Sequence, residues 1–422
     1  MSLTTTSVSQ RIRRVTTVQP AAPAGRLAPL RHRDFRWLVA GTATSSLGNA
    51  ITPVALAFGV LDLGGSPTDL GVVVGAFALA EVVTVLLGGV LGDRVSRKIM
   101  MEGSAAACTM TQGLVAVLLI GGWATIPTLA LIGAVNGCLG ALSQPSSAAM
   151  TRLTVPAELL GSAVALRGLL QTSTAVVGFS LGGVLVAAVG PGWAIAVDAA
   201  TFAIAATCFS RLQVPHSRPG TARTSLLADL AEGFREVMRH AWLWLLIGQA
   251  MLYHLVYGGA QAVLGPVVVG ETFGRSLWGV ALSALMAGFV VGGAVCVRWR
   301  PRLAVGTLLL SLTAAFPLAM ALSDHVAPIL LGAFLHGFGL QVFDVAWEVS
   351  IQEQVAEDKL ARVFSLDMVG SFVARPLGLV LTGPVAEVVG YDRWLVVVGC
   401  VMGGSALLAL LSRDVRRLER RT

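Results

Sequence analysis

The stretch Gly88-Gly89-Val90-Leu91-Gly92-Asp93-Arg94-Val95-Ser96-Arg97-Lys98-Ile99-Met100 combines closely spaced glycines with four charged side chains and separates two long apolar runs. Glycines let helices approach closely, whereas charged side chains enter hydrocarbon only at a large cost in free energy. We therefore expect this stretch to lie where a membrane meets water, as a short connection between two spanning helices.

The composition of the chain extends this interpretation to the whole protein. Of 422 residues, 55% are hydrophobic and only 13% are charged, and the mean hydropathy is +0.77. Soluble domains carry about 25% charged residues, so a polytopic membrane protein is expected. The five cysteines fall inside apolar runs without metal-ligand spacing, and we expect neither a metal nor a cofactor.

The apolar runs set the expected fold class. A spanning helix needs about 20 apolar residues. Twelve runs qualify: 37–63, 70–92, 100–121, 126–150, 161–189, 193–210, 242–269, 277–297, 303–322, 326–351, 363–388 and 394–411. Between the sixth and seventh, residues 226–239 place apolar and charged side chains at helical spacing, which predicts an amphipathic helix on the membrane surface.

The basic residues predict the orientation. All but four of the 30 lie on segments that would share one side of the membrane; the exceptions are Arg275 and Arg393 on the other side and Arg167 and Arg375 within spans. The positive-inside rule then places both termini in the cytoplasm, and the protein in the plasma (inner) membrane. This asymmetry explains the net charge of +7 without a nucleic-acid partner.

An internal repeat relates the two halves. A shift of 200 residues aligns Leu160 with Leu360, Gly178 with Gly378, Gly183 with Gly383 and Gly190 with Gly390. We therefore expect an all-α polytopic membrane protein whose twelve transmembrane helices form two pseudo-symmetric six-helix bundles, residues 36–211 and 242–412. A linker at 212–241, a disordered tail at 1–35 and a basic tail at 413–422 complete the chain. Two parallel halves with substrate held between them is a transporter architecture.

The opening stretch now resembles a known family. Gly89-x-Leu91-x-Asp93-Arg94-x-x-Arg97-Lys98 is similar to the signature that joins spans two and three in the major facilitator superfamily, although Ser96 replaces the family's glycine. Gln352-Glu353-Gln354-Val355 and Arg375-Pro376-Leu377-Gly378 resemble the twelve-span drug:proton antiporter branch. The resemblance implies the major facilitator fold, with a small-molecule substrate, protons and the bilayer as partners of a monomeric protein.

The resemblance also implies a conformational latch. Asp93 would contact the start of span eleven, together with Arg362, and hold the outward-facing state. The residues assigned to this latch are Gly89, Asp93, Arg94, Arg97, Lys98 and Arg362. The simpler alternative is that this loop is only a positive-inside anchor.

Ionisable side chains within spans need a partner or a water-filled cavity. Our candidates for proton coupling are Glu81, Asp198, Asp344, Glu348 and Arg375. Glu81 and Arg375 form either a buried ion pair or a coupling pair, whereas Asp344 and Glu348, four residues apart, share a helix face. Asp198 is alternatively a hydrogen-bonded cap, and Glu348 a solvated residue. Arg167 and Asp367 are repeat equivalents for which a structural role is expected.

Neutral polar and aromatic residues predict the substrate cavity, because pockets for amphiphiles are mostly apolar with a few polar anchors. The candidates are Asn49, Asn136, Gln144, Gln171, Tyr253, His254, Tyr257, Gln261, His336, Gln341 and Trp347. A lone histidine in a span is more often a hydrogen-bonded core residue, so His254 and His336 carry that alternative.

These features favour a proton-coupled exporter of a small amphiphilic compound, a drug or a secondary metabolite. Import of a metabolite, or a transport-inactive regulator or lipid-handling protein, are the alternatives. An enzyme is not expected, and no catalytic residue is assigned, because the sequence contains no HExxH, GxSxG or GxxxxGK[ST] motif.

Overall fold

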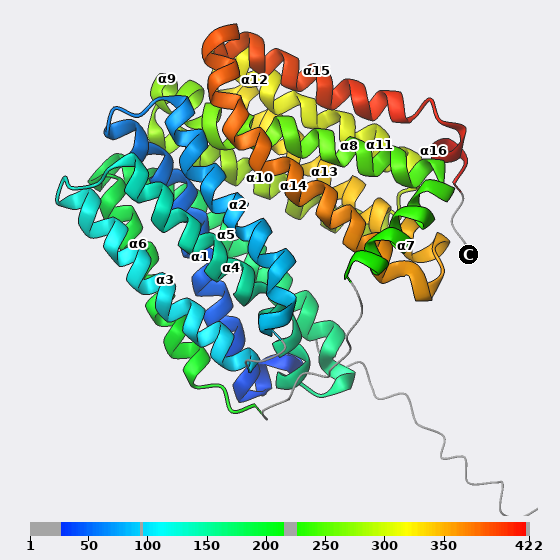
Figure 1. Cartoon of the computed structure of the whole chain (residues 1–422), viewed down its shortest axis with the longest axis horizontal. Helices are drawn as coiled ribbons and strands as arrows, with labels where there is room; N and C mark the ends of the chain where they lie inside the picture. Colours follow the sequence, from blue (N-terminus) through cyan, green and yellow to red (C-terminus); the bar gives the residue numbers. More distant parts are fainter. Residues whose placement is uncertain (1–26, 93–95, 215–225, 419–422) are drawn as a thin grey trace, which may run out of the picture.

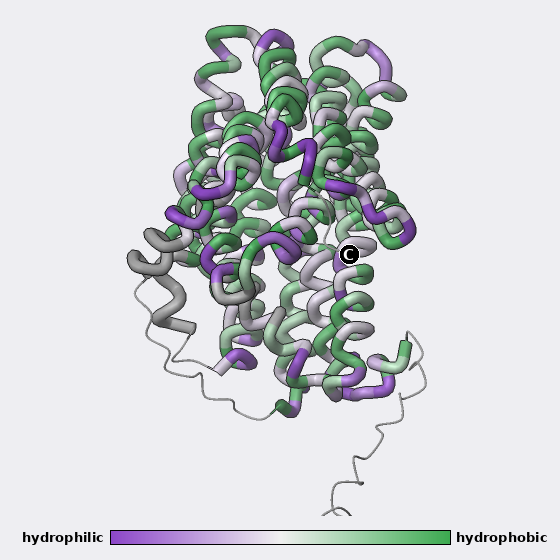
Figure 2. The backbone as a smooth tube through the Cα atoms, turned by 90° about the vertical axis from the view of Figure 1, so that its right-hand side faces the viewer, coloured by the Kyte–Doolittle hydropathy of each residue, from purple (hydrophilic) through white to green (hydrophobic). Residues whose placement is uncertain are grey.

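The computed structural model describes residues 27–92, 96–214 and 226–418. Within these ranges all regular secondary structure is helical, and twelve helices are long and apolar enough to cross a membrane. In hydrocarbon each backbone N–H and C=O must be paired within its own segment, and a helix satisfies this requirement. The expected fold class is confirmed. Figure 2 shows long hydrophobic stretches along the helices, with hydrophilic residues gathered near their ends.

The first bundle contains six long helices. They are α1 (Arg33–Asp62), α2 (Pro67–Gly92), α3 (Arg97–Ile120), α4 (Ile126–Thr154), α5 (Leu160–Val189) and α6 (Pro191–Ser210), with short 3₁₀ turns η1 (Ala28–Arg31) and η2 (Ala157–Leu159). Helix α3 begins after Ser96, whose hydroxyl accepts a hydrogen bond from the Ile99 amide at 3.4 Å and so caps the helix. The serine that departs from the family signature therefore has a local structural role.

The second bundle has the same number of spans but two irregular ones. Its elements are α8 (Ala241–Gly259), η3 (Ala260–Leu264), η4 (Pro266–Gly270), α9 (Glu271–Phe273), α10 (Arg275–Arg298), α11 (Leu303–Leu310), η5 (Ser311–Ala314), α12 (Ala315–Leu322), α13 (Val326–Gln354), α14 (Glu357–Val389), α15 (Tyr391–Ala409) and α16 (Arg413–Arg417). The seventh span winds into π-helical turns at η3 and η4, where Pro266 lacks the N–H of a regular turn. The ninth span is interrupted by the 3₁₀ turn η5.

The turns repeat between the bundles. Gly190 (φ +86°) ends α5 and Gly390 (φ +98°) ends α14, and the next span begins at the following residue in both cases. A positive φ is readily adopted only by glycine, so the same tight turn is encoded twice, 200 residues apart. The predicted duplication is therefore visible in backbone geometry.

The two bundles meet at one end of the molecule. Helix α5 crosses α10 where Gly183 faces Gly279, and α2 crosses α14 where Gly71 lies against the Leu379 carbonyl. From this closed end, which carries α9 and the turns at Gly64, Gly190 and Gly390, the bundles diverge toward the end with α7 and α16, the open end (Figure 1). Span five also lies close to α1, because a side chain at Gly178 would collide with α1 and one at Gly182 would be crowded by Ile51.

The amphipathic helix predicted between the bundles is α7 (Leu226–Arg239). It packs against α14 at the open end, where Gly233 contacts the Arg362 backbone and Val237 is buried. Glu236 of α7 accepts a hydrogen bond from Lys359 of α14 at 2.8 Å. The helix is thus fastened to the second bundle by its own side chains.

Candidate functional site

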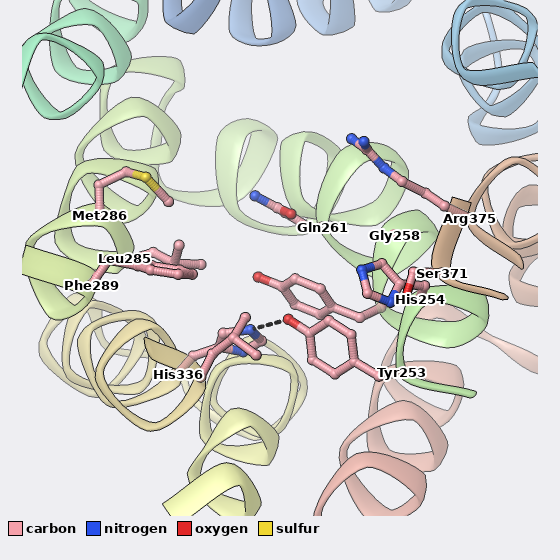
Figure 3. Close-up of a pocket in the computed structure, with 12 residues that line it drawn as sticks. Tyr253, His254, Gly258, Gln261, Leu285, Met286, Phe289, His336, Ser371 and Arg375 are labelled. Carbon is pink, nitrogen blue, oxygen red and sulfur yellow. Dashed lines mark hydrogen bonds between the residues drawn. The ribbon is translucent and has the colours of Figure 1, made fainter. Parts of the chain in front are cut away.

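A cavity of about 270 Å³ lies inside the second bundle, and we refer to it as the second-bundle cavity. It is bordered by α8, α10, α13 and α14 with η3. Its lining consists of Tyr253, His254, Tyr257, Gly258, Gln261, Leu285, Met286, Phe289, His336, Leu340, Ser371 and Arg375. Leu285, Met286 and Phe289 of α10 form one side, and Arg375, Ser371 and His254 face them from the other (Figure 3).

A tight aromatic group forms the base of the cavity. The Tyr253 hydroxyl and His336 Nε2 are 2.8 Å apart and share a hydrogen bond (Figure 3). The His336 ring lies 4.2 Å from the Tyr257 ring, centroid to centroid, and His336 is fully buried. The core hydrogen-bonding interpretation of His336 thus fits its geometry, while the residue also borders the cavity.

Other polar groups of the lining are free to meet a ligand. The Tyr257 hydroxyl is buried and has no hydrogen-bond partner within the described part of the chain. His254 donates its Nδ1–H to the Ala250 carbonyl at 2.8 Å, which leaves Nε2 as the second polar atom of the ring. The amide of Gln261 and the guanidinium of Arg375 extend into the space between the two sides (Figure 3). The site therefore offers several donors over an apolar wall.

Arg375 also interacts with the first bundle. Glu81, halfway along α2, lies within electrostatic range of the Arg375 guanidinium on α14. The two side chains are therefore near each other across the boundary between the bundles, and their pairing stays a prediction. Sequence reasoning assigned Arg375 to coupling and missed that it lines the cavity. The apolar lining residues were also missed, since in an apolar run nothing distinguishes them.

A second set of carboxylates lies further toward the open end. Asp344 of α13 is exposed and interacts electrostatically with Asp367 of α14 and with Glu348. Asp367 accepts a hydrogen bond from the indole of Trp347 at 3.1 Å, and Glu348 accepts one from Gln352 at 3.2 Å. The expected Asp344 and Glu348 pair is thus extended by Asp367, which the sequence suggested only as a repeat equivalent of Arg167.

Arg167 occupies the matching place in the first bundle. It donates to the Ser147 carbonyl at 2.6 Å, and Ser147 and Trp347 are themselves 200 residues apart. Arg167 therefore contacts Ser147 in the first bundle, and its repeat equivalent Asp367 contacts Trp347, the repeat equivalent of Ser147, in the second. This arrangement fits the structural role that was expected for both.

Asp198 lies apart from both groups. It is fully buried within the first bundle and accepts hydrogen bonds from Thr52, from Gln112 at 2.8 Å and from Thr201 at 3.3 Å. Gly48 leaves room for the carboxylate, because a Cβ there would collide with it. The geometry fits the hydrogen-bonded alternative for Asp198.

Several residues predicted for the cavity lie elsewhere. Asn136 of α4 accepts a hydrogen bond from Thr111 of α3, Gln341 packs against Gly292, and the buried Trp347 contacts Trp242 at 5.6 Å between ring centroids. Asn49 is exposed and Gln171 half-buried, and neither belongs to the lining of the second-bundle cavity. The Gln144 side chain is outside the described part. Periodicity does not distinguish a polar group between helices from one facing a cavity.

The predicted latch is described only in part. Asp93 and Arg94 lie outside the described residues, and Gly89 is described only as helical backbone of α2. Arg97 begins α3, and Lys98 donates to the Ser210 carbonyl at the end of α6 at 2.8 Å. Arg362 lies on α14 beneath α7.

A bridge that the sequence did not predict joins the bundles at the closed end. Arg275 of α10 forms a two-pronged ion pair with Asp62 of α1, with Nη1 at 2.9 Å from Oδ2. The Thr68 amide of α2 donates to Glu387 of α14 at 3.2 Å, and the hydroxyls of Ser180 and Ser283 are 2.6 Å apart. The available signal for this bridge was that Arg275 is one of only two arginines expected on the side of the membrane opposite the cytoplasm.

Among the described residues no group of three His, Cys, Asp or Glu side chains could hold a metal ion. The apolar wall and the hydrogen-bonding groups of the second-bundle cavity suit an organic molecule.

Twelve spanning helices in two related bundles, with a cavity of mixed polarity inside, define a membrane transporter of small molecules. The family model of the Major Facilitator Superfamily matches residues 38–316, and this chain belongs to that superfamily. The family resemblance stated from the sequence is thereby confirmed.

Curated relatives extend over nearly the whole chain. An uncharacterized MFS-type transporter YfiS of Bacillus subtilis is 24% identical, covering 91% of this chain and 94% of its own. Macrolide efflux protein A of Streptococcus pyogenes is 21% identical, covering 91% of this chain and 97% of its own. Multidrug efflux pump Tap of Mycolicibacterium fortuitum is 24% identical, covering 89% of this chain and 95% of its own.

Solved structures share the fold at lower identity. Nucleoside transporter NupG superposes with a TM-score of 0.70 at 13% identity, covering 90% of this chain and 97% of that one. A bacterial homolog of the human lysosomal transporter Spinster, in an inward-facing and unoccupied conformation, superposes with a TM-score of 0.68 at 15% identity. The match covers 92% of this chain and 98% of that one.

Proposed function

We propose that this protein is a secondary active transporter that exports a small amphiphilic compound, a drug or a secondary metabolite, in exchange for protons. The observation that carries the proposal is the arrangement of the bundles. They are bridged at the closed end and diverge at the open end, with a cavity of mixed polarity and intramembrane carboxylates between these ends. Rocking of two bundles about a central site is the general basis of alternating access.

The charge distribution supports an orientation for this state. Basic residues gather at the open end, at Arg97, Lys98, Arg298, Arg300 and Arg302 among others, whereas Asp62, Asp69 and Glu271 lie at the closed end. By the positive-inside rule the open end is cytoplasmic, with both termini. A location in the plasma membrane and a monomeric state are further parts of the proposal. The described state is then open to the cytoplasm, where an exporter loads its substrate.

Two groups are our candidates for moving the proton. Glu81 faces Arg375 across the bundle boundary, and Asp344 lies exposed beside Asp367 and Glu348. A carboxylate that exchanges partners between states can bind a proton in one state and release it in the other. Two of the three named relatives are efflux pumps, which supports export over import.

The first test is driven transport in inverted membrane vesicles. A panel of amphiphilic dyes, guided by compound sensitivity of a deletion strain, should accumulate inside when the interior is acidified, and a protonophore should abolish the accumulation. Asp344→Asn and Glu81→Gln should each reduce it to background. Glu158→Gln, an exposed acid at the open end, is the matched control.

Each outcome of this test is informative. Undiminished accumulation in both variants would refute our coupling assignment. Proton-driven uptake into intact cells, in the opposite direction, would establish an importer. Binding without movement in either direction would favour a regulatory or lipid-handling role.

The latch is part of the same proposal. Asp93, with Arg362 on α14, would hold the cytoplasmic end closed during the outward-facing part of the cycle, because a carboxylate is favoured near a helix N-terminus by about 0.3–1 kcal/mol. Asp93→Asn should slow turnover several-fold and leave substrate affinity unchanged. Normal turnover of this variant would show that the loop serves only as a positive-inside anchor and not as a latch.

A further inference from the structure

We propose that the second-bundle cavity selects small aromatic anions, with the ring against the α10 wall and the acid group at Arg375. The inference deepens the proposed function by naming a substrate class, and it rests on that function only for the statement that the bound anion is transported. Binding itself is testable without transport.

The charge of the lining is the first argument. Of the twelve lining residues, Arg375 is the one arginine, none is lysine, and none is Asp or Glu. Glu81 of α2, which does not border the cavity, already lies within electrostatic range of Arg375. A ligand carboxylate would be a second acid beside this guanidinium, whereas a cationic ligand would meet a guanidinium and no acid in the lining.

The unsatisfied hydroxyl is the second argument. Tyr257 is only 6% exposed, and its Oη has no hydrogen-bond partner among the described residues. Its neighbour Tyr253 is satisfied by His336, so the two tyrosines differ in function although they lie one helical turn apart. A buried hydroxyl left unpaired is unfavourable, and an acceptor atom of a ligand removes that penalty. The hydroxyl is thus a second feature of the lining that favours a ligand with acceptor atoms.

The shape of the cavity limits the rest of the ligand. Leu285, Met286 and Phe289 form a continuous apolar side opposite the polar one (Figure 3). A ring can lie against this wall, with the Met286 sulfur and the Phe289 ring as favourable neighbours. A volume of about 270 Å³ is at the low end for ligand pockets and fits one or two fused rings.

Glu81 gives the inference its sharpest consequence. It is the acid from α2 that interacts with Arg375, so it competes with a ligand anion for the same guanidinium. Removing its charge should strengthen the binding of an anion and weaken the binding of a cation. The sign of this effect therefore reports the charge of the ligand that the site accepts.

The experiment measures binding to the purified full-length protein in nanodiscs by calorimetry. The probes are 2-naphthoate, its neutral amide and the matched cation 2-naphthylmethylammonium. We expect the carboxylate to bind at least tenfold tighter than the amide, and the cation to bind most weakly. Arg375→Gln should lower carboxylate affinity at least tenfold, and Glu81→Gln should raise it several-fold.

Matched variants control for general effects. Arg393→Gln removes an exposed arginine of the second bundle, and Glu158→Gln an exposed acid of the first, and both should leave carboxylate affinity unchanged. If Arg375→Gln does not fold, Glu81→Gln still decides, since glutamine is close in shape to the glutamate that it replaces.

Tighter binding of the cation, or weaker carboxylate binding in Glu81→Gln, would overturn the inference. Failure of the proposed function is distinguishable from this result. If naphthoate binds with the expected dependence but no compound moves in proteoliposomes, the inference stands and the transport proposal falls. If the protein exports a cationic amphiphile that naphthoate does not displace, the transport proposal stands and the inference falls.

Discussion

The intramembrane carboxylates of this protein differ in their surroundings rather than in their chemistry. Asp198 is enclosed by Thr52, Gln112 and Thr201, whereas Asp344 is exposed beside Asp367 and Glu348, and Glu81 lies near Arg375 across the bundle boundary. A group with fixed hydrogen-bond donors is held in one arrangement, while a group at a boundary between moving parts can exchange partners. On this basis we assign coupling to Glu81 and Asp344, and the stability of the first bundle to Asp198.

The assignment of Asp198 predicts a loss of stability. In Asp198→Ala the Thr52 hydroxyl loses its acceptor inside the first bundle, at a cost of about 1–3 kcal/mol for a group left unpaired, and the Gln112 amide keeps only its 3.3 Å hydrogen bond to Thr52. Thermal unfolding of the detergent-solubilised protein should show a lowered midpoint, with Asp198→Asn intermediate. Asp392→Asn, an exposed residue at the closed end, is the control. If Asp198→Ala keeps the unfolding midpoint of the natural protein but loses proton-driven transport, Asp198 takes part in proton coupling instead.

At the scale of elements, helix α7 is attached to α14 by an apolar contact and by a polar one. Val237 is buried, and Glu236 bonds to Lys359 at 2.8 Å and to Arg239 at 3.2 Å. The hydrogen bond from Lys359 lowers the pKa of Glu236 below the ordinary value of 4.5. A lowered pKa in the folded state means that the contact stabilises the docked helix above the ordinary pKa. That stabilisation is lost as the pH falls through the lowered value.

This contact predicts a pH-dependent attachment of α7. Hydrogen exchange of its amides, corrected for the intrinsic pH dependence of exchange, should be slow at neutral pH and faster below pH 4.5. Glu236→Gln should show about fivefold faster exchange at neutral pH, since a partly exposed ion pair contributes up to about 1 kcal/mol. The variant and the natural protein should converge in acid. Identical protection at neutral pH would show that the apolar contact alone holds the helix.

At the scale of the whole molecule, the two bundles form a closed end that must open if substrate is to leave there. Glycine contacts between α5 and α10 bring the backbones together, and the Asp62–Arg275 ion pair bridges the exposed rim. Exposed ion pairs contribute only about 0–1 kcal/mol, so this closure is reversible and most of it comes from helix packing. That balance suits a protein that alternates between two states.

The closed end can be locked covalently. The Ser180 and Ser283 hydroxyls are 2.6 Å apart, so Ser180→Cys combined with Ser283→Cys should form a disulfide in a background lacking the five native cysteines. The oxidised protein should lose transport, and a reducing agent should restore it, whereas each single-cysteine variant should transport normally. Full transport by quantitatively cross-linked protein would mean that this end does not open during the cycle.

The sequence alone determined the twelve spans, the duplication and the family. These depend on the cost of placing polar backbone and charges in hydrocarbon, which leaves a direct record in composition and spacing. It also identified His254, Tyr257, Gln261 and His336, which do line the cavity. Their polarity within a span was the available signal.

Only the tertiary structure decided which intramembrane polar groups face each other. Asn136, Gln341 and Trp347 have the same character as the lining residues, yet they are used between helices. The closeness of Asp344 to Asp367, and the Asp62–Arg275 bridge across 213 residues, depend on how the helices rotate and cross. Helix rotation is set by packing against neighbours far away in the chain, and a local apolar pattern, nearly uniform around each of these helices, does not encode it.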